Sequence, residues 1–284
     1  MALKTCITNY SFVRSLRGGT MNVEGFCDFC GKAGFEGVEL ISYFWKDKDS
    51  EMKRLPEWLK RNRLKLAGYG TRSNFLSRES GEIEQSFENI RTAIVDARRI
   101  GAKTCRVFGG SSIEGWTLES ALDQVVGAFR KLAPLAEEQG VVLTVENHGG
   151  FPATAEEVIA VIKGVDSRCF ACLLDTGNFL VADEDPLKAA HKLAPYVRHV
   201  HVKDMLKFRA GSGLGQKASR ADFNIAACAL GAGIIPNREI FKALISAGYD
   251  GYVSMEAEGP DDEDEAKRVL DGLVCLRRWL KEIK

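Results

Sequence analysis

Short apolar segments alternate with longer segments of helical periodicity along the whole chain, and this alternation constrains the fold more than any other feature of the sequence. About eight candidate strands can be counted. They cover residues 4–9, 37–41, 64–70, 103–109, 141–146, 170–175, 197–203 and 251–256. Repeated strand–helix units are typical of a parallel sheet covered by helices. In a chain of 284 residues, they predict an α/β fold, a single (β/α)8 TIM barrel that forms one domain over residues 1–284.

Capping residues mark the ends of the predicted helices. The clearest helix covers residues 118–139, with Val125 and Phe129 near one face. Thr117 precedes it as a candidate N-cap, and Gly140 follows it at the position where a left-handed residue ends a helix. Glycines recur at other helix-to-strand junctions, which favours a closed barrel of similar units over an irregular α/β fold.

One connection is much longer than the loops that usually join barrel elements. It follows the seventh strand, covers residues 204–236, and is rich in Gly, Lys and Arg. Long loops at this end of a barrel are usually functional. We therefore expect this segment to cover a substrate.

The composition limits the classes of partner. The sequence has 39 basic residues (Lys and Arg) and 39 acidic residues (Asp and Glu). The excess of basic residues expected of a nucleic-acid-binding protein is therefore missing. No long uninterrupted apolar run or leader pattern is present, which predicts a cytoplasmic protein that does not enter a membrane. Two Cys-x-x-Cys pairs, Cys27 with Cys30 and Cys169 with Cys172, lack the context of a zinc or redox site. We interpret the cysteines as reduced thiols.

Four polar residues end apolar segments on four consecutive predicted strands. They are Glu146, Asp175, His201 and Glu256. Catalytic groups of barrel enzymes come from the carboxyl ends of the strands. Three carboxylates and an imidazole at one rim would repel one another unless a cation lay between them. The pattern therefore predicts one divalent metal ion.

The donor types indicate which metal is expected. Three oxygen donors and one nitrogen suit Mn2+, which we favour, while Mg2+, Co2+ and Zn2+ remain open. Each residue also has an ordinary structural alternative: either glutamate as a turn cap, Asp175 as a helix N-cap, or His201 as a hydrogen-bonded barrel histidine. Four such coincidences at equivalent strand ends are less expected than one metal site.

Several motifs together resemble the xylose isomerase-like TIM-barrel superfamily, which includes sugar phosphate isomerases and epimerases such as the ketose 3-epimerases. The matching segments are GFEGVEL at 34–40, VENHGG at 145–150, LDTGN at 174–178, HVHVKD at 199–204, GAGI at 231–234 and GYDGYVSME at 248–256. The resemblance covers most of the chain. It implies that the positions of the four strand-end residues bind the metal, and that Glu146 and Glu256 are also the catalytic acid and base.

Other positions are predicted to contact substrate. Asn178 stands where many family members have a histidine, so it can donate a hydrogen bond but cannot titrate. Lys207 stands where the epimerases have an arginine, with Lys203 and Arg209 nearby. His148, just after the fifth strand, is either a further substrate contact or a loop residue bonded to the backbone.

Arg106 and Asn147 each have two alternative interpretations. Arg106 either faces the pocket or forms an ion pair with Glu39. Asn147 either contacts substrate or bonds to the backbone. His199 is expected to point to the same side of its strand as His201.

The predicted function is a metal-dependent isomerase or epimerase of a small polyhydroxylated carbonyl compound. In this mechanism, two glutamates move a carbon-bound proton through a metal-stabilised enediolate. A lyase on the same scaffold, such as an inosose or 3-dehydroshikimate dehydratase, is the alternative, because the same proton removal can end in elimination. The segment HVKD at 201–204 is also somewhat similar to the dehydratases at that strand. An apurinic endonuclease needs more histidines than the four present, and a non-catalytic sugar-binding barrel would not need an intact ligand set. The sequence leaves a homo-oligomer open.

Overall fold

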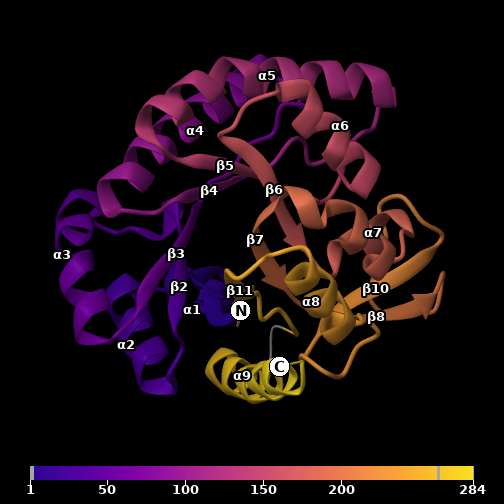
Figure 1. Cartoon of the computed structure of the whole chain (residues 1–284). Helices are drawn as coiled ribbons and strands as arrows, with labels where there is room; N and C mark the ends of the chain where they lie inside the picture. Colours follow the sequence, from indigo (N-terminus) through magenta and orange to yellow (C-terminus); the bar gives the residue numbers. More distant parts are fainter. Residues whose placement is uncertain (1–2, 261–262, 284) are drawn as a thin grey trace.

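Eight parallel strands close into a barrel in the computed structural model, which describes residues 3–260 and 263–283. The order around the barrel is β1-β11-β7-β6-β5-β4-β3-β2 (Figure 1). The strands are β1 Lys4–Thr8, β2 Gly37–Ile41, β3 Lys65–Gly70, β4 Thr104–Val107, β5 Val142–Glu146, β6 Phe170–Asp175, β7 Val197–Val202 and β11 Tyr252–Met255. The predicted TIM barrel is confirmed, and each predicted strand lies within two residues of the observed one at its amino end.

Helices surround the barrel on its outer face (Figure 1). They are α1 Val13–Arg17, α2 Val23–Ala33, α3 Lys48–Arg61, α4 Ser80–Ile100, α5 Leu118–Gln139, α6 Ala155–Val165, α7 Pro186–Leu193, α8 Asn237–Ser246 and α9 Glu265–Glu282. The apolar side of each helix packs on the strands. On α5, for example, Val125 and Phe129 are fully buried. This packing holds the strand ends in fixed positions.

The limits of α5 match the sequence prediction. Thr117 accepts a hydrogen bond from the backbone N–H of Ser120, whose side chain in turn accepts one from the backbone of Thr117. Gly140 ends the helix with φ of 64°, a left-handed conformation that glycine adopts without strain. Local chemistry alone therefore sets both ends of this helix.

The segment 204–236 is not an irregular loop as the sequence suggested. It contains a three-stranded antiparallel sheet in the order β8-β10-β9, formed by β8 Asp204–Arg209, β9 Gln216–Lys217 and β10 Phe223–Cys228. Phe223 and Ile225 of β10 alternate inward and are buried. The sheet is drawn outside the barrel near α7 (Figure 1), and a cavity of about 690 Å³ lies between it and residues 258–260.

Two further expectations can be compared with the structure. Among residues 3–260 and 263–283, no helix is both long and apolar enough to cross a membrane. All eight cysteines are free, and neither Cys-x-x-Cys pair belongs to a metal-type cluster among the described residues.

Candidate metal centre

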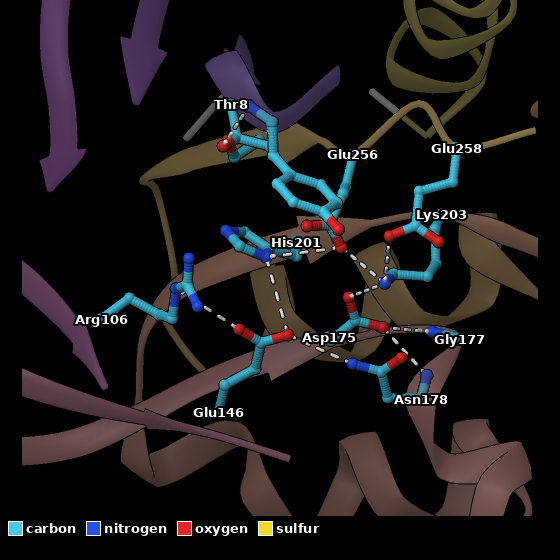
Figure 2. A network of polar contacts seen from close by, with 12 residues as sticks. Thr8, Arg106, Glu146, Asp175, Gly177, Asn178, His201, Lys203, Glu256 and Glu258 are labelled. Carbon is cyan, nitrogen blue, oxygen red and sulfur yellow. Dashed lines mark hydrogen bonds and ion pairs between the residues drawn. The ribbon is translucent and has the colours of Figure 1, made fainter. Parts of the chain in front are cut away.

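The four strand-end residues meet at the carboxyl end of the barrel. Glu146 ends β5, Asp175 ends β6, His201 lies near the end of β7, and Glu256 follows β11. Asp175 pairs with His201 across β6 and β7, so the side chains start from neighbouring positions. One ligand atom from each residue lies within 4.8 Å of the others, and all four residues are buried. Figure 2 shows them pointing toward one another.

Two buried polar atoms in this cluster have no hydrogen-bond partner. They are Nδ1 of His201 and Oδ2 of Asp175. The His201 Nδ1 atom lies 3.9 Å from a Glu146 oxygen and 4.0 Å from a Glu256 oxygen, which is too far for a hydrogen bond. Buried polar atoms are rarely left without a partner. Nδ1 of His201 faces two more carboxylates, and Oδ2 of Asp175 has only the ammonium of Lys203 near it, at 3.2 Å. This arrangement fits a divalent cation that replaces the proton on Nδ1.

Asp175 also has the structural role considered as an alternative from the sequence. Its Oδ1 atom accepts hydrogen bonds of 2.9 Å from the backbone N–H groups of Gly177 and Asn178, at the start of a short 3-10 helix. Asn147 bonds to the backbone N–H and C=O of Asp175 at 2.8 and 3.0 Å. These contacts orient the carboxylate while leaving Oδ2 directed into the cluster, so capping and metal binding are compatible here.

Two side chains hold Glu146 in place. The Nδ2 atom of Asn178 donates a hydrogen bond of 3.1 Å to Oε1, and the guanidinium of Arg106 lies 3.6 Å from Oε2. Arg106 therefore pairs with Glu146 in this structure, not with Glu39. It also lies 4.2 Å above the ring of Phe108, which fixes its plane.

Lys203 reaches the same cluster from the end of β7. Its ammonium nitrogen lies 2.5 Å from a Glu256 oxygen, 3.2 Å from Oδ2 of Asp175 and 3.7 Å from a Glu258 oxygen (Figure 2). Lys203 is buried. Glu258 was not predicted, because it lies in the loop after β11 and outside the periodic pattern. Only its position two residues beyond Glu256 pointed to the site.

Burial and charge shift the ionisation of the cluster in opposite directions. Burial raises the pKa of Asp175 to about 6, even with Lys203 beside it. Burial alone would lower the pKa of His201, but Glu39 and the ligand carboxylates raise it to about 9. Burial would raise the pKa of Glu256, but Lys203 and His201 hold it at about 2. Without a metal ion, protons therefore compete for the ligand atoms of His201 and Asp175.

This competition predicts a pH-dependent metal affinity. The pKa of His201 lies above its unfolded value of about 6.5, so its proton stabilises the metal-free protein below that pH and this stabilisation is lost as pH rises through about 9. Between pH 6 and pH 9, one proton must leave Nδ1 for each ion bound, and the apparent Mn2+ affinity should rise about tenfold per pH unit. Titration calorimetry in buffers of different ionisation enthalpy counts the protons. A flat affinity across this range would contradict the assignment of His201 as a ligand.

The remaining predicted substrate contacts lie farther out. His148 is exposed at the rim, with its ring centroid 4.6 Å from that of Phe108. Lys207 is exposed on β8 and pairs with Asp183 at 3.2 Å, while Arg209 is exposed on the same strand. The structure brings Asn178 and Lys203 to the metal cluster. It does not bring Lys207 or Arg209 there, and neither residue lines the adjacent cavity.

The fold and this cluster define the class of protein: a TIM barrel with a metal-type ligand set at the carboxyl end of its strands. The sequence model of the family "Xylose isomerase-like TIM barrel" matches residues 27–279. The chain belongs to the xylose isomerase-like TIM-barrel family.

One sequence relative and two solved structures are similar to this chain over most of its length. An inosose dehydratase from Geobacillus thermodenitrificans is 27% identical over 256 residues, covering 85% of this chain and 84% of the relative. Among solved structures, the IolI protein with a bound zinc atom superposes with a TM-score of 0.80 at 16% identity, covering 99% of each chain. The probable 3-DHS dehydratase AsbF from Bacillus anthracis has a TM-score of 0.72 at 18% identity, covering 96% and 99%. At these low identities, the two solved structures show a shared fold and nothing about activity.

The comparisons overturn one expectation. The sequence predicted an isomerase or epimerase as the main activity, but relatives 26–28% identical over most of the chain are inosose dehydratases. The isomerase prediction is therefore wrong, and the dehydratase alternative fits better. The two reactions share their first step, removal of a proton beside a carbonyl, which is why the ligand set alone did not separate them.

Proposed function

We propose that this protein is a metal-dependent dehydratase that removes water from an inosose, a cyclic ketone with several hydroxyl groups. The observation that carries the proposal is the buried ammonium of Lys203, 2.5 Å from Glu256 and within the ligand cluster. An elimination needs a base for the carbon-bound proton and a donor for the departing hydroxyl group. Lys203 supplies such a donor beside the carboxylates. The names of the sequence relatives support the same reaction.

The residues divide into two roles. Glu146, held by Asn178 and Arg106, accepts the proton from the carbon next to the carbonyl. The electron pair of that C–H bond forms a C=C bond as the C–O bond at the neighbouring carbon breaks. The departing hydroxide takes a proton from the Lys203–Glu256 pair and leaves as water. A bound divalent cation would polarise the carbonyl and stabilise the negative charge that develops on its oxygen.

The ligand set also supports a choice of metal. Glu146, Asp175 and Glu256 offer oxygen, and His201 offers one nitrogen. This donor set suits Mn2+, with Co2+, Mg2+ and Zn2+ as alternatives. Glu146 and Glu256 then serve both as ligands and as proton-transfer groups.

The cavity beside the cluster fits a small uncharged substrate. Its volume of about 690 Å³ lies in the usual range for small-molecule sites. Glu258 lines the cavity and also lies 3.7 Å from the ammonium of Lys203, so the cavity is adjacent to the cluster. Within the described lining, Lys217 is the one cationic side chain. A phosphate group would find little compensating charge there, which supports a non-phosphorylated substrate.

Product analysis tests the proposal directly. The protein is treated with a chelator, and each metal is then restored singly in the presence of inososes. We expect the activity to disappear with chelation and return with Mn2+, with an unsaturated carbonyl product that absorbs in the ultraviolet. Reaction in D2O distinguishes dehydration from reprotonation of the same carbon. A product that gains carbon-bound deuterium without losing water would show reprotonation and exclude the dehydratase proposal.

A further inference from the structure

A second polar cluster lies inside the barrel, beneath the metal centre. Glu39 of β2 is fully buried in the barrel, and its Oε2 atom accepts three hydrogen bonds. They come from Nε2 of His201 at 2.8 Å, Nε2 of His199 at 3.0 Å and Oγ of Ser254 at 2.8 Å. The other oxygen, Oε1, has no partner. One carboxylate oxygen therefore connects three strands of the barrel and touches a proposed ligand.

The backbone is adjusted at the places where this cluster forms. The register between β2 and β3 shifts between Val38 and Glu39, and Glu39 then pairs with Gly68. The register between β6 and β7 shifts so that Leu173 pairs with His199. A Cβ atom on Gly68 would lie 3.4 Å from both Glu39 and His199. The two irregularities and the small residue leave space for the cluster, so it is built into the fold.

We propose that Glu39 is a positioning residue for the metal centre, which fixes the tautomer and ring orientation of His201. This inference rests on the proposed metal centre. A carboxylate can only accept, so the His201 ring must carry its proton on Nε2. The neutral ring then has its lone pair on Nδ1, which faces the oxygens of Glu146 and Glu256 at 3.9 and 4.0 Å. Partners that orient a ligating histidine in this way commonly change metal affinity by 10–100-fold.

A second metal ion is the competing interpretation of this cluster, because ligand atoms of Glu39, His199 and His201 also lie within 4.8 Å of one another. The Glu39 Oε2 atom, however, already lies at hydrogen-bond distance from three donors. Metal–ligand bonds to nitrogen and carboxylate oxygen are about 2.0–2.2 Å long. An ion between these atoms would have to break the hydrogen bonds to both histidines. The geometry therefore fits a hydrogen-bonded support and one ion above it.

The tautomer can be read in the wild-type protein. The chain has four histidines, so nitrogen-15 spectra of the imidazoles are simple to assign. With Mg2+ or Zn2+ bound, we expect His201 to show a slowly exchanging proton on Nε2 and a metal-shifted Nδ1. A proton on Nδ1, coordination through Nε2, or two ions per chain would overturn the inference.

Variants of Glu39 test its positioning role through the metal affinity, which calorimetry measures. E39L removes the acceptor and is expected to weaken Mn2+ binding by about 10–100-fold. E39Q keeps a carbonyl oxygen that can accept from His201, and should retain most of the affinity. T144V is the matched control, because Thr144 is also fully buried and its hydroxyl has no partner. It should bind as the wild type does.

Each result has a distinct meaning. Wild-type affinity in a folded E39L would overturn the role of Glu39 but leave the metal centre intact. Absence of metal binding in the wild type would instead remove the proposed centre itself. If E39L does not fold, the wild-type imidazole spectrum decides the question.

Discussion

Replacing Glu146 or Glu256 by glutamine is expected to lower kcat for inosose dehydration by about 100-fold or more. Glutamine keeps the size of the side chain, but its amide cannot accept the carbon-bound proton or pass a proton to the leaving group. Steady-state kinetics at saturating Mn2+ measure the effect. Both residues are also proposed ligands, so bound metal must be quantified in each variant to separate lost chemistry from lost cation.

A surface variant provides the control for this experiment. Glu137 lies at the end of α5, away from the barrel mouth, where it accepts a hydrogen bond of 2.8 Å from Ser167 and lies 3.9 Å from Arg168. E137Q should therefore keep the wild-type kcat. If E146Q and E256Q turn over substrate at the wild-type rate with metal bound, the two-glutamate mechanism would be wrong.

Much of the fold was accessible from sequence because local and long-range signals agree. The apolar segments predicted to end at Glu146 and Asp175 are strands in the structure, and they end at these two residues. The predicted helix Leu118–Gln139 is observed with the same limits, since Thr117 and Gly140 set its ends through local hydrogen bonds. Parallel strands bring their carboxyl ends to one rim, so topology alone placed the four predicted ligands together.

The sheet in residues 204–236 was missed for a physical reason. Its strands β8 and β10 pair with each other, and β8 is exposed at alternate residues beyond Met205. The segment's many glycines and charges resemble those of a flexible loop. Gly211, Gly213 and Gly215 instead adopt positive φ angles in the connection between β8 and β9. The turn-forming glycines were therefore present in the sequence, but the segment was interpreted as one long loop over the substrate and not as a small sheet.

The main reaction was mispredicted because the spatial relation that favours elimination joins residues far apart in the sequence. Isomerisation and dehydration both begin with proton removal beside a carbonyl, and both fit the same four ligands. What favours elimination is a proton donor close to the departing hydroxyl group. The donor that we propose, Lys203, comes from the end of β7, and its contacts with Glu256 and Glu258 depend on residues more than fifty positions away. The sequence identified Lys203 only as a substrate contact.

Replacing Lys203 by methionine is expected to destabilise the metal-free protein by roughly 3–5 kcal/mol, because removing one partner of a buried ion pair leaves the other charges uncompensated. Methionine keeps most of the length of the chain but removes the ammonium between Asp175, Glu256 and Glu258. Denaturant unfolding after chelation measures the loss. The control is K207M, because Lys207 pairs with an exposed carboxylate and should contribute at most about 1 kcal/mol.

Adding metal tests whether a cation can replace the positive charge of Lys203. A divalent cation supplies positive charge to the same carboxylates, and binding to the native state alone adds stability as its concentration rises above the Kd. Mn2+ should therefore recover more stability in K203M than in the wild type. Activity should stay low even when the metal is bound, because the donor for the departing hydroxyl is gone. Recovered stability with wild-type turnover would show that Lys203 balances charge but transfers no proton, and unchanged metal-free stability would show that it does not balance the carboxylates.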